Sequence, residues 1–314
     1  MTIKHVISMS GGKDSQATIH YAQESVDPVV PWEDVELLAA DTGNELSLTY
    51  DHWDYIEQHF GKKVTRLRRS FDREIANRRV WVQTKWPAKG VPTWIIERAL
   101  KVLVPSGNPY LDMCLWKGFF PSRKKQFCTQ LLKTEPMVEY QMDLIDKGYA
   151  VWSWQGARRD ESFARRYAKE FEDVGGGLYI YRPLVRWTAA DTFEAMAVCG
   201  SKPNPLYRMG MTRVGCVCIN ANKDEIREIA SRFPEEVERI AEWESLVGMA
   251  SSNEKSQASF YPNPDREAHL DKRGIYKMVE WSKTSRGGRQ MDFIKANVVD
   301  EDRNVCTSSY GLCE

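Results

Sequence analysis

The chain has 314 residues, with 44 basic and 44 acidic side chains and therefore no formal net charge. This length allows one large domain or two modest ones, and a hydrophobic fraction of 42% is enough for a folded core. A neutral chain does not hold nucleic acid by bulk charge, although it can carry a local basic groove. Seven cysteines cannot all pair in disulfides within the chain.

Neither a secretory signal nor a membrane-spanning helix is expected. Residues 1–9 lack a long apolar stretch that ends in small residues, and no window approaches the roughly 18 apolar residues that span a bilayer. We therefore expect a cytoplasmic protein with no membrane partner, whose thiols stay reduced. Clustered cysteines in that compartment more often bind metal or perform redox chemistry than form bridges.

The first part of the chain alternates strands and helices. Short β-prone runs predict strands, and helical spacing of apolar residues predicts helices, in the order strand 5–9, helix, strand 35–40, helix 48–60 and strand 64–67. Such alternation is typical of a parallel sheet in an α/β fold.

An insertion over about 77–127 interrupts this alternation. It is rich in tryptophan, proline and basic residues, and we expect one helix near 92–104. The pattern then resumes with helix 129–147, strands 149–155 and 179–185, and helix 189–198. Residues 224–247 are amphipathic, and Pro234 is expected to split them into two helices. We predict an α/β domain over 1–220 and a helical C-terminal region over 221–314 with a polar, cysteine-containing tail.

The turn after the first expected strand reads Ser10-Gly11-Gly12-Lys13-Asp14-Ser15. Paired glycines let backbone N–H groups face an anion, and the following helix adds the positive end of its dipole. Lys13 adds a positive charge, and Ser10 and Ser15 add hydroxyl donors. The spacing differs from the Walker loop. The turn therefore predicts a phosphate site.

This turn resembles the pyrophosphate-binding loop (PP-loop) of N-type ATP pyrophosphatases and phosphoadenosine-phosphosulfate (PAPS) reductases. Three further blocks resemble the reductase-like branch in the expected order. They are Asp41-Thr42-Gly43-Asn44-Glu45, Gly156-Ala157-Arg158-Arg159-Asp160-Glu161-Ser162, and Arg182-Pro183-Leu184-Val185-Arg186-Trp187-Thr188 followed by Asp191.

The resemblance implies a parallel sheet flanked by helices, related to adenine-nucleotide α-hydrolases. It also implies that an adenine nucleotide, ATP or PAPS, lies across the carboxyl ends of the strands, where open α/β sheets bind ligands. Arg158 would face phosphate or sulfate oxygens. The nucleotide-binding residues implied are Ser10, Gly11, Gly12, Lys13, Asp14, Ser15, Asp41, Gly43, Gly156 and Arg158.

Four cysteines form a candidate metal set. Cys216 and Cys218 follow Asn204-Pro205-Leu206-Tyr207, as in iron–sulfur relatives of this family, but with one residue between them instead of two. Cys128 lies in a Cys-Thr-x-x-Leu-Lys block that resembles DNA-phosphorothioation sulfurtransferases, and Cys114 lies upstream. Four thiolates would hold a [4Fe–4S] cluster or zinc; buried, reduced cysteines are the alternative.

The remaining cysteines fall into two classes. Cys199 is on an apolar helix face and is expected in the core. Cys306 and Cys313 belong to the tail, and PAPS reductases bring a nucleophilic cysteine to the substrate on such a tail. The resemblance makes Cys313 the candidate nucleophile beside Lys13, Asp14 and Arg158, although the tail motif Glu-Cys-Gly-x-His is absent. Cluster ligation, a redox pair and a frayed chain end are the alternatives for the tail cysteines.

Two enzymatic functions and one binding function remain open. The first is PAPS-reductase-like reduction of an adenylyl sulfate by thiol attack, with a thioredoxin-like partner. The second is ATP-dependent sulfur transfer to DNA or RNA, with a sulfur-donor protein; a non-enzymatic nucleotide-binding regulator is the third. Basic residues interleaved with aromatics suit nucleic acid, and a partly solvated insertion is the alternative. Those in the insertion are Arg78, Arg79, Lys85, Lys89, Lys117, Arg123, Lys124 and Lys125.

Overall fold

The computed structural model describes residues 2–25, 29–254, 257–262 and 274–284. These residues divide into two compact units. The first unit contains residues 2–25, 29–68 and 129–217, and the second contains the other described residues from 69 onward.

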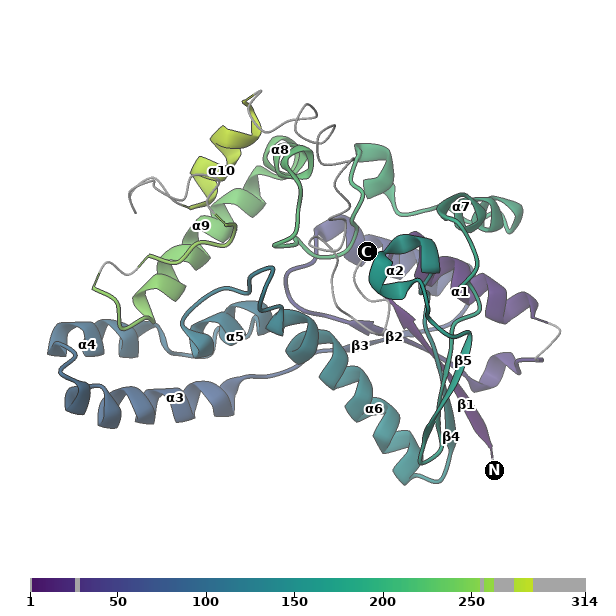
Figure 1. The fold of residues 1–314 in the computed structure, drawn as a ribbon, viewed down its shortest axis with the longest axis horizontal. Coiled ribbons are helices and arrows are strands. Elements are labelled where there is room, and N and C mark those ends of the chain that lie inside the picture. The colour runs from purple at the N-terminus through teal and green to yellow at the C-terminus, as the bar shows by residue number, and fades with distance from the viewer. Residues whose placement is uncertain (1, 26–28, 255–256, 263–273, 285–314) are drawn as a thin grey trace. The chain divides into compact units, whose positions relative to one another are not determined.

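The first unit is built on a six-stranded sheet with the order β3-β2-β1-β4-β6-β5 (Figure 1). All neighbouring strands are parallel except β5, which pairs antiparallel with β6 at the edge. The strands are β1 (Ile3–Met9), β2 (Val35–Ala40), β3 (Val64–Leu67), β4 (Ala150–Trp154), β5 (Phe171–Gly175) and β6 (Leu178–Tyr181). The predicted α/β class with a mainly parallel sheet is confirmed.

Each face of this sheet has its own core, because successive strand residues point to opposite sides. On one face, Ile7 of β1 and Leu37 of β2 pack with α1 (Lys13–Glu24) and α2 (Ser47–Phe60). On the other face, Val6 and Leu38 pack with Met137 of α6 (Glu135–Asp146). Both faces of β1 and β2 are therefore buried, which explains their continuous apolar runs.

The strand order fixes where a ligand site can form. From β1 the chain passes through α1 to β2 on one side, whereas β4 lies on the other side of β1. Such a reversal of strand order leaves a crevice at the carboxyl ends of the two strands. The turns after β1 and β4 are the loop at 10–15 and the block at 156–162.

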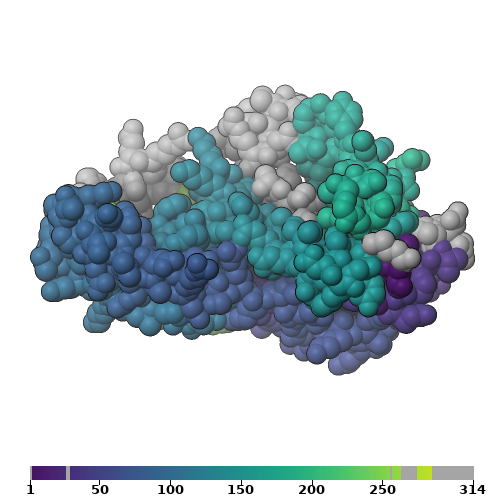
Figure 2. Space-filling model, turned by 90° about the horizontal axis from the view of Figure 1, so that it is seen from below, coloured from purple at the N-terminus to yellow at the C-terminus, as the bar shows by residue number. Residues whose placement is uncertain are grey.

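The second unit is helical. The helices α4 (Thr93–Val102) and α5 (Pro109–Lys117) lie in the predicted insertion, and α3 (Asp72–Lys85) begins before the predicted start of the insertion at 77. The helices α8 (Lys223–Arg232), α9 (Pro234–Met249) and α10 (Ile275–Ser282) follow the sheet domain in sequence. Both α4 and α5 pack against α9, and α10 packs against α8. The Arg98 guanidinium joins the two segments by donating to backbone carbonyls of Met249, Ser251, Asn253 and Glu254. In Figure 2, α3 and α4 appear as adjoining blue surfaces.

Several elements differ from the sequence predictions. The helix predicted near 92–104 is α4, which begins directly after Pro92. The helices α3 and α5 were not predicted; Pro109 is the first residue of α5, where proline is tolerated. The strand predicted at 179–185 ends at Tyr181. The polar edge strand β5 and helix α10 were not predicted. The split of 224–247 at Pro234 is confirmed by α8 and α9.

Candidate functional site

The loop at 10–15 is closed by its own hydroxyl groups. The Ser10 Oγ accepts from the Gly12 N–H at 3.2 Å, and the Ser15 Oγ donates to the Gly12 carbonyl at 2.9 Å. The Gly12 carbonyl also accepts from the Gln16 N–H, so α1 begins directly from the loop. Both predicted serines therefore shape the turn.

Glycine is required at position 11 for two reasons. Its φ is +88°, in the left-handed region that favours glycine, and a Cβ there would lie 2.9 Å from Nε1 of Trp53. Trp53 lies on α2 and is buried. The close approach of α2 to the loop therefore depends on the missing side chain.

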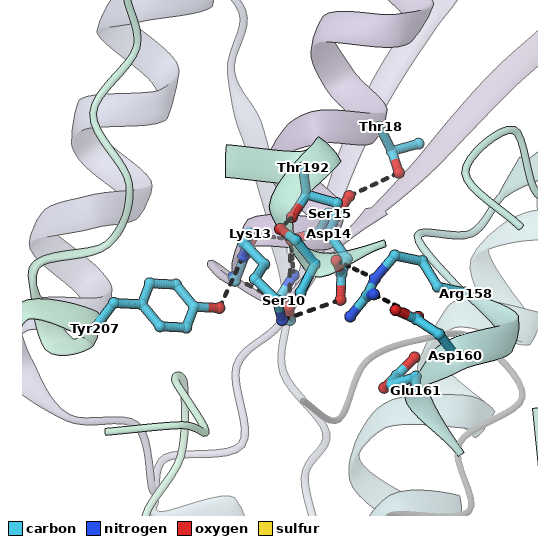
Figure 3. A network of polar contacts seen from close by, with 12 residues as sticks. Ser10, Lys13, Asp14, Ser15, Thr18, Arg158, Asp160, Glu161, Thr192 and Tyr207 are labelled. Carbon is cyan, nitrogen blue, oxygen red and sulfur yellow. Dashed lines mark hydrogen bonds and ion pairs between the residues drawn. The ribbon is translucent and has the colours of Figure 1, made fainter. Parts of the chain in front are cut away.

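Asp14 joins two cations at the mouth of the loop (Figure 3). Its Oδ1 accepts from Nε of Arg158 at 2.7 Å, and its Oδ2 lies 3.3 Å from Nζ of Lys13. The side chains of Arg158 and Asp14 are only 4% and 1% exposed. A second carboxylate, Asp160, also pairs with the Arg158 guanidinium.

The charge of Arg158 is retained despite its burial. Burial lowers the pKa of the guanidinium, but the neighbouring Asp14, Asp160 and Glu161 carboxylates outweigh this effect and raise its pKa overall. The block at 156–162, which follows β4, thus brings a fixed cation to the loop that follows β1. The family resemblance implied that Arg158 faces phosphate or sulfate oxygens, and that role stays a prediction.

Gly156 lies against the first turn of α1. A Cβ at this position would be 2.8 Å from the carbonyl carbon and oxygen of Asp14 and 3.0 Å from the Ser15 nitrogen. These are backbone atoms that cannot move aside independently. Glycine at 156 therefore lets the chain after β4 contact the loop, and its predicted contact with nucleotide stays a prediction.

The turn after β2 is organised around two carboxylates. Asp41 accepts from the Gly43 N–H and from the Tyr50 hydroxyl, and it forms an ion pair with Arg68 at 2.7 Å. Gly43 has a φ of +74°, which a tight turn requires here. Asp41 and Gly43, the two residues of this block predicted to bind nucleotide, therefore both shape the turn.

Glu45 is a site residue that the sequence analysis did not select. Its carboxylate is buried and accepts from the Thr42 hydroxyl at 2.7 Å, from the Thr42 and Asn44 amides at 3.1 Å and from Tyr50 at 3.3 Å. Burial raises its pKa, and the Thr42 bond and the Lys133 charge oppose that rise. No signal in the sequence marked this burial, which depends on the pairing of the turn with residues 215–217.

Residues 215–217 pair with the turn after β2. The Leu46 amide donates to the Gly215 carbonyl, and Asn44 and Val217 exchange two bonds. Cys216 therefore lies opposite Glu45, and its Sγ is 3.9 Å from Nζ of Lys133. A Cβ on Gly215 would lie 3.5 Å from the Ser10 carbonyl, so this segment also borders the loop.

Two residues of the Asn204-Pro205-Leu206-Tyr207 block hold the loop from its other side. The Tyr207 hydroxyl accepts from the Lys13 amide at 2.9 Å, and Asn204 donates to the Gly11 carbonyl at 3.1 Å. Figure 3 shows Lys13 between Tyr207 and Asp14. The sequence drew attention to this block only as the approach to the cysteines.

Asp191, from the third reductase-like block, has a helix-capping role. Thr188 and Asp191 form a reciprocal capping box at the start of α7 (Ala189–Val198). The same block provides Arg182, which donates to Oε1 of Gln155 at the end of β4.

The candidate metal set is not supported. The described part of the chain contains no group of three or more His, Cys, Asp or Glu side chains arranged to hold a metal ion. Cys114 is buried, and burial with a contribution from Cys128 raises its thiol pKa well above the usual value. The Cys218 Sγ accepts from the Asn220 amide. We derive no reaction step through a metal.

Two other cysteine predictions have different outcomes. Cys199 is not in the core; it is half-buried at the C-terminal end of α7, where the helix is partly solvated. Cys306 and the candidate nucleophile Cys313 lie outside the described residues.

Within the residues that the structure describes, no helix has the length and apolar character needed to cross a membrane.

Comparisons with known proteins identify relatives along most of the chain. An uncharacterized protein of Escherichia phage 186 is 38% identical over 99% of this chain and 96% of its own length. An uncharacterized protein of Methanocaldococcus jannaschii is 24% identical over 77% of this chain, and the match spans 41% of that longer relative.

A solved PAPS reductase from Candida auris, in complex with phosphate, has a TM-score of 0.40 and 15% identity, covering 69% of this chain and 82% of that chain. The family assignment does not depend on this distant likeness. The family model of the phosphoadenosine phosphosulfate reductase domain matches residues 4–103 and 108–221. These ranges include the loop at 10–15, the turns after β2 and β4, and Cys216 and Cys218. The chain therefore belongs to the phosphoadenosine phosphosulfate reductase domain family.

Proposed function

We propose that the protein binds an adenine nucleotide with its phosphates at the loop 10–15 and reduces an adenylyl sulfate by thiol attack. The observation that carries this proposal is the meeting of Lys13, Asp14 and Arg158 at the carboxyl ends of β1 and β4. Family membership supports nucleotide-linked sulfur chemistry in general.

Each residue of the cluster has a defined part in this proposal. The N-terminus of α1 and the Lys13 charge would attract the phosphate oxygens. Arg158 is held by Asp14 and can present two N–H groups to a phosphate or sulfonate. These cations would stabilise the negative charge that develops on the departing nucleotide.

The proposed reaction starts with a cysteine thiolate, assigned to Cys313. The thiolate attacks the sulfonate sulfur, an S–S bond forms, and the S–O bond breaks with its electron pair leaving on the nucleotide phosphate. A thioredoxin-like dithiol then attacks the enzyme thiosulfonate and releases sulfite. The dithiol supplies the two electrons and becomes a disulfide.

The test is sulfite release by the full chain under anaerobic conditions. PAPS and adenosine phosphosulfate are each supplied with thioredoxin and a reductant, and sulfite is measured. We expect turnover that Cys313→Ser abolishes and Cys199→Ser retains, and nucleotide binding on the order of 10- to 100-fold weaker in Lys13→Ala. Absence of sulfite with both substrates would overturn the proposed reaction but leave nucleotide binding to be measured by titration.

One observation favours a second candidate, ATP-dependent sulfur transfer. Cys216 lies 3.9 Å from the Lys133 ammonium and opposite Glu45, at the turn after β2. A thiol at this place suits delivery of sulfur to an adenylated acceptor. Pyrophosphate release from ATP, dependent on an added nucleic acid and lost in Lys13→Ala, would favour this candidate. Nucleotide binding without either activity would favour a regulator.

A further inference from the structure

The end of α5 and the loop after it form a basic, aromatic finger, defined here as residues 117–127 of the second unit. Residues 113–128 contain Lys117, Arg123, Lys124 and Lys125 but no acidic residue, although the whole chain is neutral. Positive charge is therefore concentrated locally instead of following the average composition.

The tip of the finger is a closed turn. The Ser122 and Lys125 backbones exchange two hydrogen bonds of 3.2 and 2.9 Å, which places Arg123 and Lys124 at the centre of the turn. Arg123, Lys124 and Lys125 are all exposed. A fixed backbone thus presents three cations to solvent.

Buried residues anchor the base of the turn. Pro121 is buried, and the buried Phe120 ring packs against Phe260, with centroids 5.4 Å apart. In Figure 1 the chain leaves α5 through this segment before it continues toward α6. The anchoring keeps the finger in a set position on the helical unit, which lowers the ordering cost of a ligand contact.

Aromatic rings lie on the same segment as the cations. Phe119 is 46% exposed and packs edge-to-face on Phe127 at 5.4 Å. The Lys117 ammonium lies 3.7 Å from the Trp116 ring centroid and 5.9 Å from that of Phe127. The finger therefore combines an exposed ring face with adjacent positive charges.

Other basic residues of the same unit are engaged by the fold. Arg79 donates to the Leu100 and Leu103 carbonyls and so caps the end of α4. Arg98 binds the carbonyls that follow α9, and Arg78 stacks on Trp81 at 4.4 Å. These three arginines contact the unit's own backbone and rings, whereas Arg123, Lys124 and Lys125 of the finger are exposed next to the exposed Phe119 ring.

We propose that the finger binds single-stranded nucleic acid. Cations that contact phosphates and aromatic rings that stack on bases are the combination used for sequence-tolerant binding of single strands. The inference concerns a partner, and it does not depend on which reaction occurs at the loop 10–15.

The test measures binding of the full chain to labelled oligo(dT) and oligo(U) of about 20 nucleotides, by fluorescence anisotropy between about 50 and 200 mM salt. Arg123→Gln/Lys124→Gln should lower the slope of log affinity against log salt by about 1.4, at about 0.7 per phosphate contact. Phe119→Ala should weaken binding by about 5- to 150-fold, the usual effect of losing one stacked base.

Two controls separate this site from general charge and from the nucleotide loop. Lys101→Gln/Lys283→Gln removes the same charge from exposed lysines of the same unit and should leave the salt slope unchanged. Lys13→Ala should lose adenine-nucleotide affinity but keep oligonucleotide binding. Circular dichroism and thermal unfolding confirm that each variant is folded.

Three outcomes would overturn the proposal. In the first, the finger variants and the control variant lose the same amount of oligonucleotide affinity. In the second, the protein binds a nucleic-acid duplex as tightly as it binds single strands. In the third, it binds vesicles containing phosphatidylserine but neither oligonucleotide. A preference between oligo(dT) and oligo(U) that is lost with the finger variants would support the proposal.

Discussion

Asp14 is the residue on which the charges of the loop depend. It lies beside two cations, Lys13 and Arg158, and its side chain is almost fully buried. Removing one member of a buried ion pair leaves the other without compensation, which costs much more than the pair itself contributes. Asp14 therefore holds the Arg158 guanidinium in place and compensates its buried positive charge.

At the residue scale, Asp14→Asn should destabilise the protein by about 3–5 kcal/mol. The asparagine keeps the shape but removes the charge that compensates Arg158. The matched control is Asp160→Asn, because that carboxylate also pairs with Arg158 but is 44% exposed; its loss should cost about 1 kcal/mol or less. Unfolding in urea measures both values, and equal losses would show that Asp14 has no special role.

At the scale of elements, the site depends on close contact between the turn after β4 and the start of α1. Gly156 contacts the backbone of Asp14, and Gly11 contacts Trp53 on α2. The backbone N–H groups at a helix N-terminus bind anions, and the N-terminus of α1 lies in the turn that Gly11 and Gly156 border. The two glycines therefore allow three elements to meet around one turn.

We expect Gly156→Ala to displace the loop and to weaken nucleotide binding by about tenfold or more. The added methyl group overpacks the contact and should lower the free energy of unfolding by about 1–3 kcal/mol. Gly148→Ala is the control, because φ there is +91° but a Cβ would contact nothing. It should lower stability without changing affinity. Calorimetric titration with ATP and PAPS distinguishes these outcomes; unchanged affinity in Gly156→Ala would contradict the proposed geometry.

At the scale of the whole molecule, two buried histidines couple folding to pH. Burial lowers the pKa of His20 and of His52 to about 4, with the charge of His59 adding to the shift at His20. Above pH 6.5 both states are neutral at these positions. Below it, the unfolded chain binds protons that the folded protein does not, so stability must fall as pH falls.

Each histidine should reduce the free energy of unfolding by up to about 1.4 kcal/mol per pH unit between about pH 6.5 and 4. The raised pKa values of Glu45 and Glu244 act in the opposite direction, because the folded state holds their protons more tightly. The measurement is therefore the slope in wild type minus the slope in His20→Gln, from urea unfolding. Identical slopes would show that the pKa of His20 is the same in the folded and unfolded states.

The packing of the second unit also belongs to the whole molecule. Residues 69–128 and 218–284 are separated in the chain by residues 129–217, which contain β4, β5 and β6, yet their described parts form one unit. Arg98 and its four carbonyl partners lie more than 150 residues apart in sequence. Helical spacing along each segment carried no information about this association.

The sequence by itself determined the features that depend on local backbone requirements. Three such features have one dominant physical interpretation each. They are the glycine pair between a strand and a helix, the two turns after buried strands, and Pro234 at the start of a helix. They gave the α/β class, the position of the loop and the split of the C-terminal helices. Cys199 was misplaced in the core because an apolar helix face does not reveal whether its last turn is covered.

Only the tertiary structure decided which distant side chains meet. Arg158 reaches Asp14 across 144 residues, and Tyr207 reaches Lys13 across 194. The first contact follows from the placement of β4 beside β1, and the second from the packing of residues 204–207 against the loop. The surroundings of Glu45 form only when residues 215–217 pair with its turn. Strand order and loop closure depend on the burial of whole faces, and no local pattern of residues specifies them.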